Sequence, residues 1–73
     1  MEPDILQKID TWFTYHAPGP EDLVHYAHLR EAAKKFALAI VEHTPRCADQ
    51  TVALRKIREA VMTANAAVAC KGV

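Results

Sequence analysis

Two long stretches decide the fold: residues 20–43, PEDLVHYAHLREAAKKFALAIVEH, and residues 45–70, PRCADQTVALRKIREAVMTANAAVAC. Pro20 suits the first turn of a helix, and the two acidic residues after it complement the positive end of the helix dipole. Thr44 should end the first stretch, because the residue before a proline avoids the helical conformation. The sequence therefore predicts one helix over residues 20–43 and a second over residues 45–70.

Apolar side chains recur in both stretches at the spacing of a single helix face. The first stretch carries Tyr26, Leu29, Ala33, Phe36 and Ile40, and the second carries Leu54, Ile57, Val61, Ala64 and Val68. Steps of three and four residues predict one apolar seam on each helix. Because the connection is short, the two seams should face each other in an antiparallel hairpin.

The residues before the hairpin divide into a short helix and a loop. Residues 4–10 follow a proline and are predicted as a short helix, while residues 11–15 are β-branched and aromatic, which favours an extended conformation. The next five residues, His16-Ala17-Pro18-Gly19-Pro20, break any helix. We expect this segment to fold back across the hairpin, with Trp12 and Phe13 in the core.

The chain of 73 residues has room for one domain, and a domain of this size buries only about 60% of the surface that its unfolded chain exposes. Further apolar residues lie off the two seams: Val24, Leu38, Val41, Val52 and Met62. A lone hairpin cannot cover both faces of its helices. We therefore expect an all-α domain over residues 1–73, covered by its N-terminal segment and by further copies in a homo-oligomer.

Charge and hydropathy exclude several classes of protein. Nine Lys and Arg balance nine Asp and Glu, whereas a general DNA or RNA binder carries an excess of basic charge. The longest apolar run, residues 36–41, is too short to span a membrane, and no signal-peptide pattern opens the chain. Cys47 and Cys70 do not indicate a disulfide framework. We expect a cytosolic protein that binds neither DNA nor membranes.

Catalytic and metal chemistry find little support. His25 and His28 lie one turn apart, but a zinc site needs three or four convergent ligands and none of its usual spacings occurs. His43 and Cys47 could form a dyad near a helix start, yet no third orienting group is visible. We therefore expect no metal site, no cofactor and no enzyme.

The candidate binding residues lie in the loop and on the first long helix. Tyr15 and His16, beside Pro18, either cap the core or offer flat faces on which nucleobases stack. Arg30 borders the apolar seam, where a guanidinium can reach a phosphate, and Lys34 lies one turn further along the helix. The other interpretation is a solvated basic face with pairs such as Glu31–Lys35 and Arg55–Glu59.

Three motifs carry a family resemblance: Phe13-x-Tyr15-His16-x-Pro18, Tyr26-x-x-Leu29-Arg30-x-x-Ala33-Lys34 and Glu59-Ala60-Val61-Met62-x-x-Asn65-Ala66-Ala67. Over about residues 11–69 the chain resembles the helical-hairpin domain of phage anti-CBASS cyclic-nucleotide sponges, which phage anti-Thoeris sponges share. The resemblance implies a homo-oligomer, described as a hexamer, in the host cytoplasm. Such a protein binds cyclic dinucleotides, for example cyclic GMP-AMP, and sequesters them without hydrolysis.

The resemblance also assigns roles to residues. Tyr15 is expected to stack on a base and Arg30 to contact a phosphate, with His16, Pro18 and Lys34 beside them in the ligand site. A separate site for cyclic trinucleotides is also implied, but Thr63 stands where many members have Trp, and Lys71 is the only basic residue near the position of a family Arg. We assign no residues to that second site. The alternative function is a small helical adaptor that binds another protein and no nucleotide.

Overall fold

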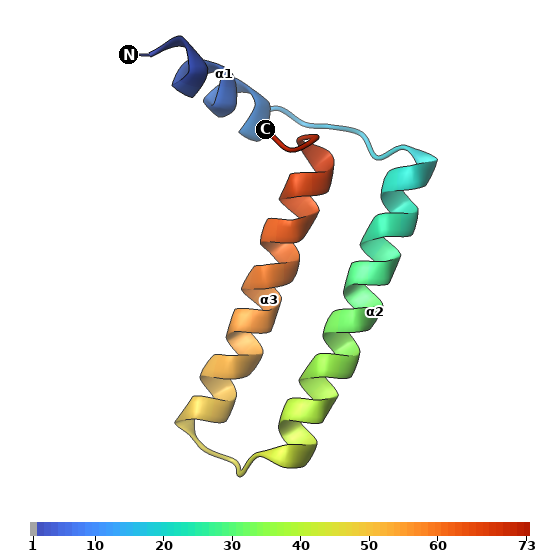
Figure 1. Ribbon diagram of the computed structural model, residues 1–73, viewed down its shortest axis with the longest axis vertical. Helices are drawn as coiled ribbons and strands as arrows, with labels where there is room; N and C mark the ends of the chain where they lie inside the picture. Colours follow the sequence, from blue (N-terminus) through green and yellow to red (C-terminus); the bar gives the residue numbers. More distant parts are fainter. Residues whose placement is uncertain (1) are drawn as a thin grey trace.

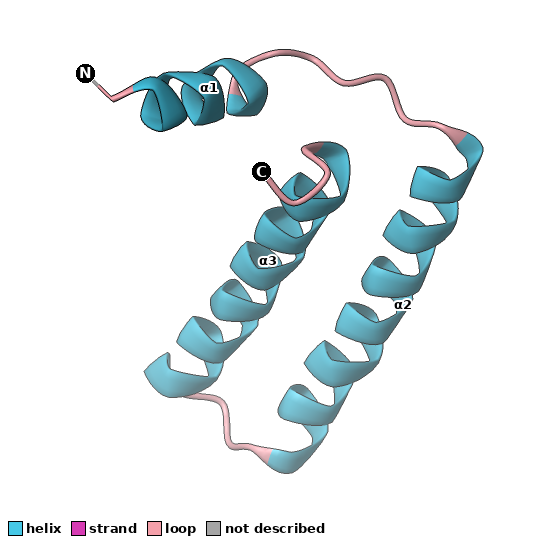
Figure 2. Ribbon diagram, turned by 45° about the horizontal axis from the view of Figure 1, so that its top comes forward, coloured by secondary structure: helices cyan, strands magenta, loops and turns pink. Residues whose placement is uncertain are grey.

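The computed structural model describes residues 2–73, which form three α-helices and no strand. They are α1 (Pro3–Trp12), α2 (Pro20–His43) and α3 (Ala48–Ala69). Helices α2 and α3 run antiparallel and side by side, and α1 lies beyond the C-terminal end of α3 (Figures 1 and 2). The prediction of an all-α helical hairpin is confirmed.

Two helix boundaries differ from the sequence-based expectation. Helix α1 continues to Trp12, so residues 11 and 12 are helical and not extended; the amide of Phe13 still donates to the carbonyl of Ile9 at 3.1 Å. The apolar side chains of α1 recur at helical spacing, and this periodicity outweighs the β-propensity of single residues. Helix α3 begins at Ala48 and not at residue 45, because residues 44–47 are needed to reverse the chain. There the side-chain amide of Gln50 donates to the hydroxyl of Thr44 at 3.1 Å.

The molecule is a slab one helix layer thick. Its principal extents are 47 × 32 × 14 Å, and the smallest extent is close to the diameter of a single helix, about 10–12 Å. Its radius of gyration is 15.7 Å, whereas a compact domain of this length has about 11 Å. Within residues 2–73 only Cys70 is buried, so nearly every side chain on the hairpin retains contact with solvent.

The seam between α2 and α3 matches the predicted apolar pattern on α3 but differs on α2. The five predicted residues of α3 are all partly shielded, whereas Phe36 is 58% exposed and Ala37 faces the seam in its place. Steps from Ala33 to Ala37 and on to Ile40 follow the same helix face, and small alanine side chains let the two backbones approach closely.

Helix α1 does not cover the hairpin, so the expectation that it folds back across α2 and α3 is wrong for the single chain. It is held at one end: the indole N–H of Trp12 donates to the carbonyl of Val73 at 2.8 Å, and the thiol of Cys70 lies 3.9 Å from the carbonyl of Thr11. Trp12 is exposed and Phe13 is 82% exposed, so neither belongs to a core of this chain. Both faces of the hairpin therefore remain open.

Candidate functional site

The loop between α1 and α2, residues 13–19, presents Tyr15 from an anchored backbone; we call it the aromatic loop. The hydroxyl of Thr14 donates to the carbonyl of Asp10 at 2.6 Å, and Nε2 of His16 donates to the carbonyl of Thr11 at 2.7 Å. Both bonds attach the start of the loop to the C-terminal turn of α1. Tyr15, between these two anchors, is 83% exposed, so its ring is free to stack on a ligand.

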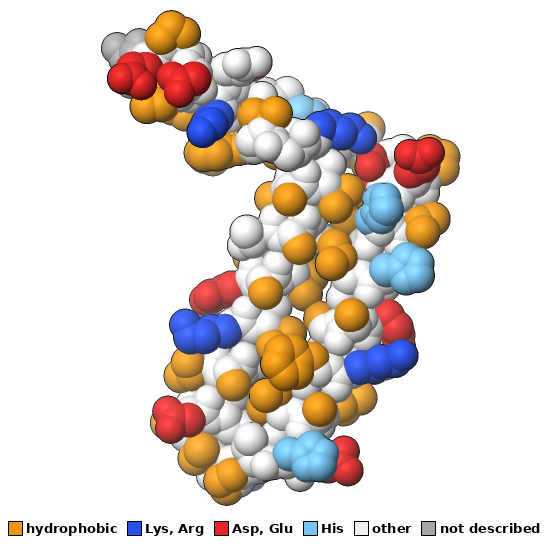
Figure 3. Space-filling view, in the orientation of Figure 1, with side chains coloured by type: hydrophobic (Ala, Val, Ile, Leu, Met, Phe, Trp, Pro, Cys, Tyr) orange, Lys and Arg blue, Asp and Glu red, His pale blue; other side chains and the backbone are white. Residues whose placement is uncertain are grey.

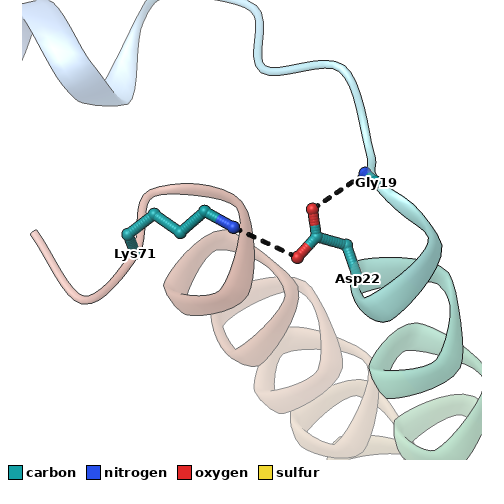
Figure 4. A network of polar contacts seen from close by, with 3 residues as sticks. All are labelled: Gly19, Asp22 and Lys71. Atoms are coloured by element: carbon teal, nitrogen blue, oxygen red, sulfur yellow. Dashed lines mark hydrogen bonds and ion pairs between the residues drawn. The ribbon is translucent and has the colours of Figure 1, made fainter.

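The end of the aromatic loop is fixed by Asp22 in the first turn of α2. One carboxylate oxygen of Asp22 accepts the backbone N–H of Gly19 at 3.0 Å, and the other lies 3.4 Å from the ammonium nitrogen of Lys71 (Figure 4). The Gly19 donor holds the pKa of Asp22 below its usual 3.8; partial burial opposes the shift, and Lys71 and His25 add to it. Asp22 therefore connects the loop and α2 to the end of α3.

A groove of about 520 Å³ runs along one side of the seam between α2 and α3. Three cations line it, Arg30 and Lys34 from α2 and Arg58 from α3, together with apolar side chains such as Leu54 and Met62. No acidic residue is among its lining. We call this surface the basic groove; it has the size of a small-molecule site and suits an anionic ligand with apolar parts. On the face of the molecule that Figure 3 shows, hydrophobic side chains also follow the line between α2 and α3, and Lys and Arg lie beside Asp and Glu on the flanks.

The five predicted site residues fall into two groups on one chain. Tyr15, His16 and Pro18 lie in the aromatic loop, and Arg30 and Lys34 line the basic groove. Arg30 lies ten residues beyond the start of α2, which places it about 15 Å along the helix axis. Within a single copy of the chain, the aromatic group and the basic group therefore lie apart.

The interpretation as a solvated basic face is correct in that its Lys and Arg side chains are exposed, but the ion pairs it predicted do not form. Among residues 2–73 the ion pairs are Asp22 with Lys71 and His43 with Glu42, the second at 4.0 Å, so neither Glu31–Lys35 nor Arg55–Glu59 forms. The cations of the basic groove consequently have no carboxylate partner in the described part of the chain. Such unpaired cations are available to phosphate groups.

The possible metal ligands and the two cysteines lie apart within residues 2–73. No group of three His, Cys, Asp or Glu side chains gathers there. Cys47 is exposed and Cys70 is buried at opposite ends of α3, about 35 Å apart by the rise of the helix, so the two thiols cannot pair within one chain.

The sequence interpretation missed three residues that the structure brings to these surfaces: Asp22, Lys71 and Arg58. The position of Asp22, three residues after Gly19, is the helix-start signal for a side chain that caps the backbone. Arg58 reaches the basic groove through the register of the two helices, and Lys71 reaches Asp22 through the reversal of the chain. Neither relation has a local sequence signal.

Fold and surfaces define a class: small α-helical hairpin proteins with an exposed aromatic loop and an unpaired basic groove. The comparison with protein families identifies the family within this class: the family described as Acb2/Tad1, hairpin domain, matches residues 6–69. The chain belongs to this family, which is the family of anti-CBASS and anti-Thoeris sponges. The comparisons with curated proteins and with solved structures gave no match. No helix within residues 2–73 is long and apolar enough to cross a membrane.

Proposed function

We propose that this protein is a phage sponge that binds cyclic dinucleotides of the cyclic GMP-AMP type and sequesters them without hydrolysis, so that CBASS signalling fails in the host cytoplasm. The observation that carries the proposal is the family match over residues 6–69, nearly the whole chain. The protein needs no cofactor and no catalytic group for this role, because it withholds the ligand and changes none of its bonds.

The two groups of predicted site residues suit the two parts of such a ligand. A cyclic dinucleotide has two bases, which stack on aromatic rings, and two phosphates, which pair with cations. Tyr15 supplies an exposed ring, and Arg30 and Lys34 supply unpaired charges beside an apolar surface. His16 and Pro18 complete the loop side of the site. The net charge of zero is no obstacle, because only two phosphates need partners.

The proposed site lies between copies of the chain. Tyr15 and Arg30 are separated on one copy, whereas a two-fold pair of copies can bring one ring and one cation from each subunit to a ligand that is itself close to two-fold symmetric. The exposed apolar residues Leu38, Val41 and Met62 support such an assembly, because a slab one helix thick leaves them in water. We propose the hexamer of the family resemblance as the assembled form.

Calorimetry with a panel of cyclic di- and trinucleotides, followed by chromatography of the ligand, tests the proposal. Tight binding with full recovery of intact ligand is the expected result. Conversion of the ligand would instead indicate an enzyme. Absence of binding to every cyclic nucleotide would favour the alternative, a helical adaptor that uses the exposed apolar faces of the hairpin for another protein.

A further inference from the structure

Lys71 adopts a backbone conformation that a lysine normally avoids. Its φ is +56°, in the left-handed region, and Gly72 follows with a φ of +80°. The amide of Lys71 donates to the carbonyl of Val68 at 3.3 Å, and the amide of Gly72 donates to the carbonyl of Ala67 at 3.0 Å. These bonds form a Schellman motif, in which the first position after the helix cap is usually glycine. Here lysine occupies that position and glycine comes one residue later.

The side chain of Lys71 has a partner that accounts for its place in this strained turn. Its ammonium nitrogen lies 3.4 Å from Asp22, whose other oxygen accepts the N–H of Gly19 at 3.0 Å (Figure 4). Asp22 is 15% exposed and Lys71 is 75% exposed, so the carboxylate lies between the two helix ends while the lysine reaches it from outside. We call these three residues the Asp22 clasp. Strain that persists at one residue points to a role for its side chain.

We propose that Lys71 and Asp22 are positioning residues of the ligand site: through Gly19 they hold the aromatic loop in the conformation that presents Tyr15. This inference rests on the proposed function. The start of the loop is already attached to α1 through Thr14 and His16. The clasp fixes its other end, so a ligand that stacks on Tyr15 does not have to order the loop when it binds.

Lys71→Gly separates this role from a purely structural one. Glycine removes the ammonium group and relieves the left-handed strain, so the melting temperature should equal or exceed that of wild type. Affinity for cyclic GMP-AMP should nevertheless fall about three- to tenfold. An exposed ion pair contributes little by itself, but two copies of the loop hold each ligand, so the loss counts twice. Lys71→Arg keeps the charge and should retain near wild-type affinity. A loss of affinity that follows a loss of thermal stability would overturn the proposal.

Asp22→Asn distinguishes positioning from direct contact between Lys71 and the ligand. This variant removes the negative charge that holds Lys71 and leaves the ammonium group free. If Lys71 acts by positioning, Asp22→Asn should weaken binding as Lys71→Gly does, and the double variant should be no weaker than either single one. If Asp22→Asn binds as tightly as wild type or more tightly while Lys71→Gly binds weakly, Lys71 contacts the ligand itself and the proposal is wrong.

Amide hydrogen exchange in the ligand-free protein tests the clasp independently of whether the proposed function is correct. Exchange of the Gly19 amide, whose N–H donates to Asp22, should be several-fold faster in Lys71→Gly and Asp22→Asn than in wild type, with α2 and α3 unchanged. Unchanged exchange at Gly19 overturns the clasp, whatever the protein binds. Failure of wild type to bind any cyclic nucleotide overturns the proposed function, and the exchange data still decide whether the clasp orders the loop.

Discussion

Replacement of Arg30 by alanine is expected to weaken ligand binding strongly without damage to the fold. Arg30 is exposed on α2, lines the basic groove and has no ion-pair partner among residues 2–73. Alanine is the best helix former, so the 24-residue helix loses nothing from the exchange. The helical circular dichroism spectrum and the melting temperature of Arg30→Ala should therefore match those of wild type.

The expected loss follows from the single contact that the variant removes. A hydrogen bond to a charged group contributes about 1.5–3 kcal/mol, which is roughly a 10- to 150-fold change in affinity. If two copies each direct one Arg30 at a ligand, both contacts disappear, and the loss reaches at least about 100-fold. Because Arg30 is exposed, salt should screen part of this effect, and the loss should be larger at low ionic strength.

Calorimetry with cyclic GMP-AMP at two salt concentrations measures this loss, and light scattering verifies that the oligomer is intact. Lys35→Ala is the matched control, because Lys35 carries the same charge on the same helix but does not line the basic groove. The control should retain wild-type affinity. Equal affinity of wild type and Arg30→Ala at both salt concentrations would refute the assignment of Arg30 to the ligand phosphate.

Three further results are expected. Tyr15→Ala should cost about 1–3 kcal/mol of binding free energy per stacked base by calorimetry, while Tyr15→Phe keeps the ring and most of the affinity; full affinity of the alanine variant would exclude stacking. Leu38→Asp or Val41→Asp should dissociate the oligomer in light scattering, because an unpaired charge in an apolar interface costs several kcal/mol; a wild-type protein that is already a stable monomer would contradict this. Acid should release the Asp22 clasp: the folded-state pKa of Asp22 is lowered from 3.8 by Gly19 and then by Lys71 and His25, so its contribution is complete above pH 3.8 and is lost as the pH falls through the folded-state pKa. The free energy of unfolding, measured by denaturant titration at a series of pH values, should therefore decrease more steeply below pH 3.8 for wild type than for Asp22→Asn. An identical pH dependence of the two proteins would contradict the clasp.

The helices and their hairpin arrangement were predictable because their signals are local. Pro20, the acidic residues after it and the Thr44–Pro45 break lie within a few residues of the helix ends they define, and the α3 seam follows from steps of three and four. The candidate site residues were also visible as residue types, since Tyr15 lies outside any helix and Arg30 borders the seam. Their roles in binding stay predictions.

The sequence by itself determined three helical segments, a short turn and an excess of apolar surface, because backbone propensity and periodicity act between near neighbours. Tertiary structure alone decided that α1 lies beyond the hairpin, that Ala37 replaces Phe36 in the seam and that Arg58 joins the basic groove. It also brought Lys71 to Asp22, 49 residues apart in the chain. These outcomes depend on the rotation and register of one helix against another, which are set by side-chain packing across the seam and not by any local pattern.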